Sequence, residues 1–409
     1  MILILFTASF PYASGGEQNF IEAELPYLTD AFERVVLVPE RRAAAGSKLD
    51  RRVEVEDGYS ERLQSAGQLR TFVAGLFSAQ AYQEVLSKPW LLLRPAFLKR
   101  LLFFAGQAEL TRDWLIGWIR QQGLDPEKCL CYTYWFDQAA LGIGLAKRTL
   151  PGLKSVSRVH RYDLYEELRV PPYWPCRETA LAHVDRLFAV SEAGTEYLRG
   201  KYPQFASKIC TARLGVPDPG SITQPSRDGK FRIVSCSRVL PVKRLDLMLD
   251  GIEAAALRRP SLLIEWGHFG TGPLGKLEDR LRMLPANLQV DLAAYSTRAD
   301  LFRYYREQPV DAFINVSSSE GTPVSIMEAI SCGIPVVATS VGGNVEVVTA
   351  RNGFLIAENP TPDQIADALL ATWDNPGQLR AGSRELWSEK YNAARNYSDF
   401  VRTLTENRR

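Results

Sequence analysis

Residues that build metal and redox centres are scarce in this sequence. Only three histidines occur, His160, His183 and His268, and none has a neighbour at the spacing of a zinc site. The six cysteines include no C-x-x-C pair and most lie in apolar stretches, which predicts free thiols in a reducing compartment. We therefore expect neither a metal centre nor a disulfide framework.

Long apolar runs and an excess of one charge are also missing. The opening "MILILFTASFPY" has no basic n-region and is too short to cross a bilayer, so it predicts a buried first strand and a cytoplasmic protein. Lys and Arg total 49 against 47 Asp and Glu, and the net charge of +2 gives no reason to expect nucleic acid as a partner. With 46% hydrophobic and 23% charged residues, the composition is that of a globular protein.

The fingerprint of a dinucleotide-binding oxidoreductase is absent too. Such a protein would need G-x-G-x-x-G after a strand and an acidic residue about 20 positions later. The first strand leads instead into "TASFPYASGGEQ", and "GHFGTGPLG" has the wrong spacing. A periplasmic sugar-binding protein would need a secretory signal, which the opening does not supply. An NAD-dependent oxidoreductase is therefore a weak alternative.

What the sequence does contain is a regular alternation of strand-like and helix-like segments over 409 residues, more than one hydrophobic core usually supports. We expect strands at 1–7, 34–40, 128–135, 155–160 and 186–191, and again at 231–237, 261–267, 288–294, 311–317 and 334–340. Helices are expected at 15–32, 245–259, 273–284, 298–308 and 362–373, with a mostly helical stretch between the second and third strands. This alternation is typical of parallel sheets covered by helices.

One segment separates the two halves. Residues 217–230 are rich in Pro, Gly, Ser and charge, and we expect a linker there. The prediction is an α/β fold of two doubly wound Rossmann-like domains, an acceptor-binding domain at 1–216 and a nucleotide-sugar-binding domain at 231–385. Residues 386–409 are expected to form a C-terminal helix that packs back toward the first domain. Ligands bind beyond the carboxyl ends of strands in such sheets, so two facing domains would place the site in the cleft between them.

Two glutamates lie where the strand expected at 311–317 leads into a helix. In "SSSEGTPVSIMEA", Thr322 suits the N-cap and Pro323 the first helical position. Glu320 then lies in the loop, and Glu328 lies about one and a half turns into the helix. Carboxylates accept paired hydrogen bonds from vicinal hydroxyls, and an open helix start suits a phosphate. The pair could bind one elongated ligand, or it could be a capping carboxylate beside a solvated one.

The same stretch carries a family resemblance. "EGTPVSIMEAISCGIPVVATSVGGNVEVV" resembles the E-x7-E signature of family-four retaining glycosyltransferases, which have the GT-B fold, and the match continues through "NGFLI". "CSRVLPVKRLDLMLDGI" resembles the phosphate-binding segment of that family, and "HFGTGPLGKLE" its glycine-rich loop, with His268 and Phe269 in place of the usual residues. "RVHRYDLYEE" and "SFPYASGGEQNFIEAELPYL" resemble exopolysaccharide glycosyltransferases of the colanic-acid and amylovoran type.

The resemblance implies a role for each matching residue of the second half. Arg238 and Lys243 would bind the donor diphosphate and stabilise the negative charge that the leaving group gains. Glu328 would accept hydrogen bonds from the nucleotide ribose, and Glu320 would hold hydroxyls of the transferred sugar. The backbone of the adjoining loop would support the sugar or the phosphate, at Gly321, Thr322, Pro323 and Val324.

In the first half the resemblance places His160 in the donor-sugar pocket, acting through its side chain or its backbone, with Asp163 in the same motif. A single histidine near a strand end is more often structural, and that alternative stays open. Gly15 and Gly16 follow the first strand, where a glycine pair lets the backbone approach a ligand. In the family this loop faces the phosphate and the acceptor, and Glu17 beside it is a lesser candidate.

Taken together, the resemblance implies an enzyme that moves a hexose from a UDP- or GDP-linked donor to a glycan acceptor in bacterial polysaccharide biosynthesis. It implies retention of anomeric configuration, often a lipid-linked acceptor, and no cofactor. No D-x-D occurs in the chain, and D-x-D is the usual metal handle of the other large glycosyltransferase fold. Its absence agrees with a metal-independent mechanism. A nucleotide-sugar epimerase on the same architecture is the main alternative.

Residues 87–123 are apolar and aromatic, with basic residues interspersed. Arg94, Lys99, Arg100 and Arg112 interrupt the stretch too often for a membrane-spanning helix. It could lie on an anionic membrane surface, or it could form helices that pack on the first domain. The membrane interpretation fits a lipid-linked acceptor and implies a peripheral contact with the cytoplasmic face of the inner membrane.

Overall fold

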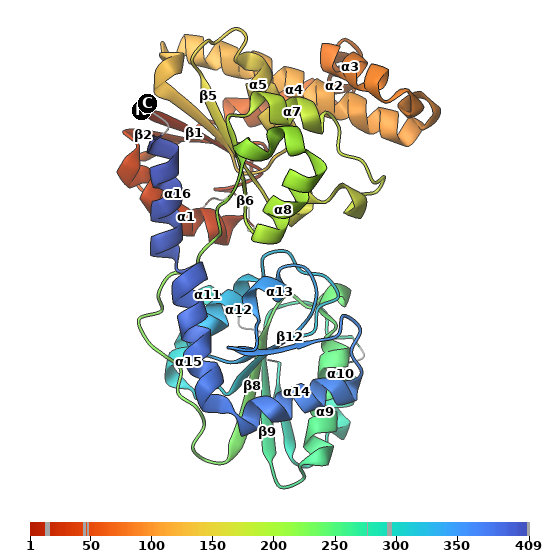
Figure 1. Cartoon of the computed structure of the whole chain (residues 1–409), viewed down its shortest axis with the longest axis vertical. Coiled ribbons are helices and arrows are strands. Elements are labelled where there is room, and N and C mark those ends of the chain that lie inside the picture. The colour runs from red at the N-terminus through yellow and green to blue at the C-terminus, as the bar shows by residue number, and fades with distance from the viewer. Residues whose placement is uncertain (13–16, 44–45, 47–48, 276, 293–296, 407–409) are drawn as a thin grey trace. The chain divides into compact units, whose positions relative to one another are not determined.

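The computed structural model describes residues 1–12, 17–43, 46, 49–275, 277–292 and 297–406. The chain forms two compact units. Unit 1 combines Met1–Arg213 with the residues from Tyr397 onward, and unit 2 is Leu214–Asn396. Each unit is built on its own parallel sheet with helices on both sides (Figure 1). The predicted fold of two doubly wound Rossmann-like units is therefore confirmed.

Unit 1 contains a seven-stranded parallel sheet in the order β3-β2-β1-β4-β5-β6-β7. The order reverses between β1 and β4, and a crevice for ligands forms at such a reversal, beyond the carboxyl ends of the strands. The central strands are almost wholly buried because helices cover both faces. The strands are β1 (Ile2–Thr7), β2 (Arg34–Pro39), β3 (Val53–Val55), β4 (Cys129–Thr133), β5 (Lys154–Val159), β6 (Arg186–Ala189) and β7 (Ile209–Thr211).

Two long helices of unit 1, α2 (Gly58–Leu76) and α4 (Pro95–Gln121), cross at glycines. A Cβ atom at Gly75 would lie 1.9 Å from the carbonyl oxygen of Leu102, and one at Gly106 would lie 1.9 Å from that of Thr71. The two backbones touch, so neither position has room for a side chain. The remaining helices of unit 1 are α1 (Gln18–Ala31), α3 (Ala79–Ser87), α5 (Gln138–Ala146), α6 (Arg161–Leu164), α7 (Arg177–His183) and α8 (Glu192–Lys201), with 3-10 turns that include η1 (Pro89–Leu93).

The C-terminal helix α16 (Ala393–Glu406) belongs to the core of unit 1 beyond its first turn. Its Phe400 lies against a fully buried ion pair, in which Nη2 of Arg158 on β5 lies 3.2 Å from Oε2 of Glu24 on α1. The Arg158 guanidinium is 4.2 Å from the Phe400 ring centroid and donates through Nε to the Tyr132 hydroxyl at 2.9 Å. Charges buried this deeply need such partners, so the pair fixes α1, β4, β5 and α16 in one arrangement.

Unit 2 has a six-stranded parallel sheet in the order β10-β9-β8-β11-β12-β13, which reverses between β8 and β11. Its strands are β8 (Lys230–Cys236), β9 (Leu263–Phe269), β10 (Leu288–Asp291), β11 (Ala312–Asn315), β12 (Val336–Thr339) and β13 (Gly353–Ile356). Its helices are α9 (Leu245–Arg258), α10 (Leu277–Arg280), α11 (Arg298–Glu307), α12 (Val324–Ser331), α13 (Asn344–Val347), α14 (Pro362–Asp374) and α15 (Pro376–Leu386).

In the described part of the chain, every strand expected from the sequence is present within a few residues of its predicted bounds. Residues 293 and 294 of the strand expected at 288–294 lie outside that part. The three strands that the sequence does not predict, β3, β7 and β13, are short strands at the edges of the sheets. The helix expected at 273–284 is reduced to the single turn of α10 and a following 3-10 turn. The division between the units falls after Arg213. Residues 217–229 therefore belong to unit 2; they carry no helix or strand, and they hydrogen-bond to the rest of that unit, for example from the Ser226 amide to Asp311.

The stretch 87–123 spans the end of α3, η1 and all of α4. The inward side of α4 is buried in the core of unit 1, at Leu101, Ala105 and Leu115 among others. Packed helices therefore account for most of this stretch. In the described part of the chain, no helix combines the length and the apolarity needed to cross a membrane.

Candidate functional site

Two loops of unit 2 leave β8 and β11, the neighbours at which the strand order reverses. They are joined directly, because the Ser318 amide donates to the Val242 carbonyl at 2.9 Å. Arg244 joins them again through its guanidinium, which donates to the carbonyls of Val316 at 2.6 Å and Ser317 at 2.9 Å. The two loops therefore form one surface at the carboxyl edge of the sheet, where ligands of such folds bind.

Lys243 and Glu320 make the ion pair at the centre of this surface. The Lys243 ammonium lies 2.6 Å from Oε1 of Glu320, and the Asn315 amide donates to the same oxygen at 3.0 Å. Glu320 is only 8% exposed, and the lysine compensates the cost of burying its carboxylate. Within the described residues Oε2 of Glu320 has no hydrogen-bonding partner, so it is available to a ligand hydroxyl.

Glu328 is paired with a residue that the sequence did not single out. Nε of Arg298, the first residue of α11, lies 2.6 Å from its Oε1. Burial raises the pKa of Glu328 to about 7, and Arg298 opposes the shift. Glu328 therefore changes its charge near neutral pH. Its pairing could not be read from the sequence, because it depends on how α11 packs against α12.

Lys243 and Glu328 both influence the pKa of the same residue, Cys236. Burial raises the pKa of the Cys236 thiol at the end of β8, the charge of Glu328 raises it further, and the charge of Lys243 lowers it. The two predicted residues therefore lie in one neighbourhood. Arg238, two residues beyond β8, is exposed and makes no hydrogen bond or ion pair with any described residue. Its guanidinium is free to meet an anion.

The start of α12 presents backbone donors to the same surface. The helix begins at Val324, one residue later than predicted, because Pro323 has a ψ of 84°, outside the helical region, and takes the N-cap position that the sequence predicts for Thr322. The amides of Gly321, Thr322 and Val324 have no partner among the described residues. Free amides at a helix start attract anions and other acceptors.

A glycine turn after β12 supports the loop that carries Glu320. Gly342 has a φ of 48°, and a Cβ atom there would lie 1.9 Å from the Glu320 carbonyl oxygen. The Gly343 amide donates to the Gly321 carbonyl at 3.0 Å. Only glycine combines this left-handed conformation with so close an approach, so the turn fixes the height of the Glu320 loop above the sheet.

His160 of unit 1 is a buried, neutral imidazole. It lies between the rings of Tyr134 and Trp135, with centroids 4.8 and 4.7 Å away. Burial lowers its pKa to about 3, and the charge of Arg158 lowers it further. Its Nε2 atom has no hydrogen-bonding partner among the described residues. His160 can therefore offer a ligand one neutral polar atom, but it cannot act as a cation near neutral pH.

Asp163 and Glu17 hold loops together. Asp163 accepts hydrogen bonds from the amides of Phe136 at 2.5 Å and His160 at 2.7 Å, and burial raises its pKa to about 6. Glu17 accepts from the amide of Ser9, at 2.6 Å, and from the amides of the residues on either side of Ser9. Both carboxylates are occupied by backbone donors, so they position the loops after β1, β4 and β5. Gly15 and Gly16 lie outside the described residues.

Unit 1 also contains a pocket of about 530 Å³ at the carboxyl ends of its central strands, lined by residues of that unit alone. No sequence pattern predicts it, because its lining comes from loops and helices far apart in the chain. No group of three or more His, Cys, Asp or Glu residues is placed to hold a metal ion in the part of either unit that the structure describes.

Comparison with known proteins points to one family for unit 2. Residues 230–375 match the family model described as "Glycosyl transferases group 1". The GtfA subunit of the UDP-N-acetylglucosamine–peptide N-acetylglucosaminyltransferase of Streptococcus pneumoniae is 29% identical over 208 residues, 49% of this chain and 40% of that protein. LpsB, a lipopolysaccharide core biosynthesis mannosyltransferase of Rhizobium meliloti, is 31% identical over 166 residues, 38% of this chain and 45% of that protein.

The chain thus spans less than half the length of these relatives. The crystal structure of HepE from Anabaena, in complex with UDP, matches over 99% of both chains with a TM-score of 0.62 at 16% identity. A likeness at such low identity establishes the fold. Together, these matches and the two parallel sheets show that the chain has the GT-B fold and that its residues 230–375 match the model of the glycosyl transferases group 1 family.

Proposed function

We propose that this protein is a glycosyltransferase that moves a hexose from a nucleotide diphosphate sugar to a glycan acceptor. We further propose that the reaction retains anomeric configuration, needs no metal ion, and serves bacterial polysaccharide synthesis of the colanic-acid or amylovoran type. The observation that carries the proposal is the pairing of Lys243 with Glu320 and of Arg298 with Glu328 beside the free amides of α12. All four residues lie within the matched region, 230–375.

The cations of this surface suit a leaving group that gains charge. When the bond between the sugar and the donor phosphate breaks, the departing nucleotide diphosphate gains one negative charge. Lys243 and the unpaired Arg238 would bind this charge more strongly in the transition state than in the ground state, which is what accelerates a reaction. This is the electrostatic work that a metal ion performs in other transferases.

The carboxylates suit the sugar and the ribose. One carboxylate oxygen of Glu320 is paired with Lys243, and the other would accept hydrogen bonds from hydroxyls of the transferred sugar. Glu320 would therefore position the lysine and bind the substrate at the same time. Glu328, once ionised, accepts the two vicinal ribose hydroxyls of a UDP- or GDP-linked donor. Arg298 acts as a positioning residue, because it favours the ionised form of Glu328.

Unit 1 would bind the acceptor in this proposal. The neutral His160 contributes either its unpaired Nε2 or its backbone to the bound sugar, and it takes no part as a cation. A lipid-linked acceptor would bring the enzyme to the cytoplasmic face of a membrane, and unit 1 carries a surface suited to that contact.

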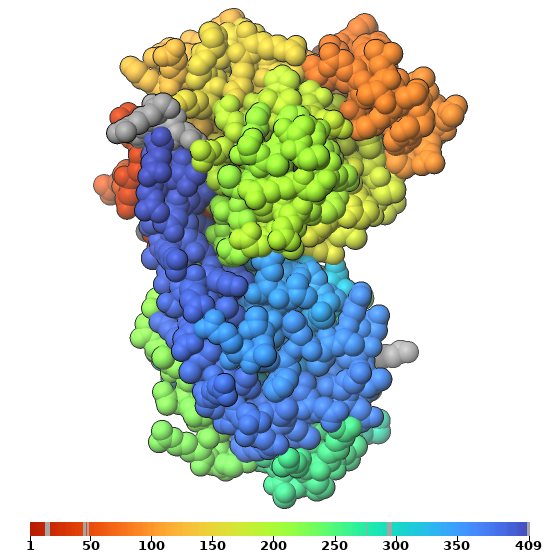
Figure 2. All heavy atoms as spheres, viewed as in Figure 1, coloured from red at the N-terminus to blue at the C-terminus, as the bar shows by residue number. Residues whose placement is uncertain are grey.

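This surface, the apolar patch, is formed by the end of α2, by α3 and by η1, at the outer margin of unit 1 (orange in Figure 2). Phe77, Leu86 and Leu93 are 81%, 82% and 84% exposed. Monomeric proteins rarely leave so many large apolar side chains in water without a partner. The other exposed members of the patch are Leu69, Val73, Leu76, Tyr82, Trp90 and Leu92.

Charge indicates an anionic membrane as the partner of the patch. Between residues 62 and 100 the sequence contains one acidic residue, Glu84, which is buried and paired with Lys88. The same stretch carries exposed basic residues, including Arg70, Arg94 and Lys99. Apolar side chains ringed by cations bind the boundary of a bilayer with anionic lipids. The patch lies mostly upstream of the membrane face expected at 87–123, because the apolar side of α4 is buried in the core of unit 1.

Removing either proposed diphosphate contact should slow transfer strongly. We expect Arg238→Ala and Lys243→Ala each to lower kcat/KM for the donor by about 10- to 150-fold, since a charge-assisted hydrogen bond contributes about 1.5–3 kcal/mol. A screen of UDP-, GDP- and ADP-sugars by thermal shift identifies the donor, and label from its sugar is then followed into the glycan. Arg306→Ala, which removes an exposed arginine of α11, is the matched control and should behave as wild type.

Normal turnover by both variants would refute this donor site. Labelled nucleotide sugar that is released in altered form, with no label in any glycan, would instead identify an epimerase.

Donor binding should weaken as the pH falls through 7. The pKa of Glu328 is raised to about 7, so its ionised form, which accepts the ribose hydroxyls, is lost below that pH. Between pH 8 and pH 6 we expect KM for the donor to rise by about tenfold, following the loss of the ionised form. Glu328→Gln should bind weakly at every pH, and Arg298→Met should move the loss to higher pH. A KM that stays constant between pH 6 and pH 8 would contradict this role.

The membrane contact is tested by sedimentation with vesicles. We expect wild-type protein to sediment with vesicles containing phosphatidylglycerol and to stay in solution with vesicles of phosphatidylcholine alone. The triple variant Phe77→Ser, Leu86→Ser, Leu93→Ser should lose binding, because it removes the most exposed apolar groups. A control variant of unit 2, Leu257→Ser with Met283→Ser, removes similar exposed groups elsewhere and should bind normally. If the triple variant sediments with phosphatidylglycerol vesicles as fully as the wild-type protein does, the patch is ruled out as a membrane contact.

A further inference from the structure

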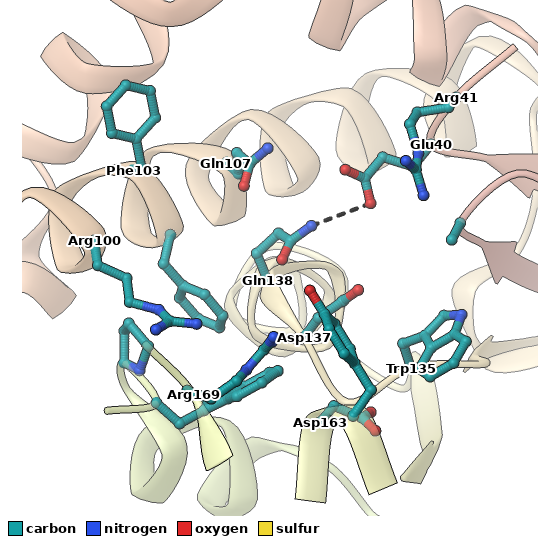
Figure 3. A pocket seen from close by; sticks show the side chains of 15 residues that line it. Glu40, Arg41, Arg100, Phe103, Gln107, Trp135, Asp137, Gln138, Asp163 and Arg169 are labelled. Atoms are coloured by element: carbon teal, nitrogen blue, oxygen red, sulfur yellow. Dashed lines mark hydrogen bonds between the residues drawn. The ribbon is translucent and has the colours of Figure 1, made fainter. Parts of the chain in front are cut away.

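The pocket of unit 1 opens where the loops after β1, β2 and β4 meet the side of α4 (Figure 3). Its volume of about 530 Å³ lies within the range of small-molecule sites. Figure 3 shows Arg100 and Arg169 at one end of the pocket and Glu40 near the other. The two ends therefore differ in charge, and each can be assigned a chemical partner.

The end formed by Arg100 and Arg169 carries two cations without an anion. The Arg169 guanidinium lies 3.8 Å from the ring centroid of Tyr162 and 4.5 Å from that of Trp174, so it is held in place by stacking. Its Nε atom is buried and has no hydrogen-bonding partner among the described residues. Arg100 donates to the Pro171 carbonyl at 2.8 Å. Neither guanidinium forms an ion pair with any carboxylate that the structure describes.

These two cations also repel each other. Burial lowers the pKa of Arg100, and the charge of Arg169 lowers it further. Two neighbouring guanidinium groups with no counter-ion cost free energy, and a bound anion would relieve that cost. A dianion would neutralise both, whereas a single carboxylate would leave one charge uncompensated. Phosphate and diphosphate groups have the required charge and fit the planar fork of arginine.

The opposite end presents oxygen acceptors and an aromatic ring. Glu40 follows β2 and accepts a hydrogen bond from the Gln138 side chain at 3.2 Å, and Asp137 accepts from the Ala139 amide at 2.9 Å as the N-cap of α5. Burial raises the pKa of Glu40, and the charge of Arg41, which also lines the pocket, opposes the shift. Carboxylate and amide oxygens beside the indole of Trp135 suit the hydroxyls and the apolar face of a sugar.

One cation of this end, Arg100, lies on the helix that adjoins the apolar patch. Arg100 is in the second turn of α4. Only one residue, Arg94, separates this helix from η1. Trp90 of η1 packs against Phe97 of α4, with ring centroids 5.4 Å apart, and Leu93 beside it is exposed. An anionic group held by Arg100 could therefore carry an apolar chain toward the patch.

We propose that this pocket binds a phosphorylated sugar, with the phosphate or diphosphate held by Arg100 and Arg169 and the sugar hydroxyls facing Glu40 and Asp137. Its identification as the acceptor, a sugar joined through diphosphate to a lipid, rests on the proposed function. The binding of a phosphorylated sugar to this pocket does not depend on the proposed function, so either proposal can fail while the other holds. Arg100 and Arg169 are then binding residues that decide the charge of the acceptor.

Direct binding to the full-length protein tests the assignment. The probe is a hexose 1-phosphate, followed by calorimetry and by the fluorescence of the tryptophans that line the pocket. We expect it to bind at least tenfold more tightly than the methyl hexoside, and Arg100→Gln and Arg169→Gln each to remove this preference. Arg169→Lys should restore part of it, because lysine keeps the charge but not the fork. Thermal unfolding of each variant shows whether it is folded.

Two comparisons distinguish this pocket from the donor site and from a site for a single carboxylate. Lys243→Ala, which disables the proposed donor site, should leave binding of the hexose 1-phosphate unchanged; loss of binding in that variant would place the probe in unit 2 and overturn the proposal. Equally tight binding of a methyl glucuronide would show that a single carboxylate suffices, and would overturn the assignment to phosphate.

An alkyl diphosphate sugar tests whether the phosphate belongs to a lipid-linked acceptor or to a free phosphorylated sugar. If its affinity exceeds that of the hexose 1-phosphate, and Leu93→Ser removes the gain, the acceptor is lipid-linked. Equal affinity would assign the pocket to a free phosphorylated sugar and would overturn the lipid-linked acceptor.

Discussion

The ion pair between Lys243 and Glu320 is the contact on which the candidate site depends. It joins the loop after β8 to the loop after β11, and these strands are neighbours at the point where the order of the sheet reverses. Arg244 holds the same two loops through their carbonyls. Without these bonds the buried carboxylate of Glu320 would lose its counter-charge, and the free amides of α12 would lose their fixed position relative to the lysine.

The carboxylates that the sequence analysis singled out in the two units have different partners. Glu17 and Asp163 accept hydrogen bonds from backbone amides and so fix loops of unit 1. Glu320 and Glu328 are paired with cations instead, and a ligand can share or exchange those partners. The resemblance places Asp163 in a functional motif and Glu17 beside a functional loop, and the hydrogen bonds show that both carboxylates hold backbone loops in place.

Much of the fold could be predicted because its signals are local. The strand, loop and helix around Glu320 follow from an apolar run, Thr322, Pro323 and Gly333, and the predicted start of the helix is right to within one residue. The pairing of Arg298 with Glu328 was not predictable, because it depends on the packing of two helices. The left-handed conformation of Arg244 and the pocket of unit 1 have no local signal either. Edge strands such as β3, with three residues, are too short to show a pattern.

The most direct test of the donor site is a crystal structure of the protein with a bound nucleotide sugar. We expect diphosphate oxygens within hydrogen-bonding distance of Lys243 and Arg238, the ribose hydroxyls on Glu328, and a sugar hydroxyl on Glu320. A nucleotide found elsewhere, with Lys243 and Glu328 both out of reach of it, would contradict the assignment of this site.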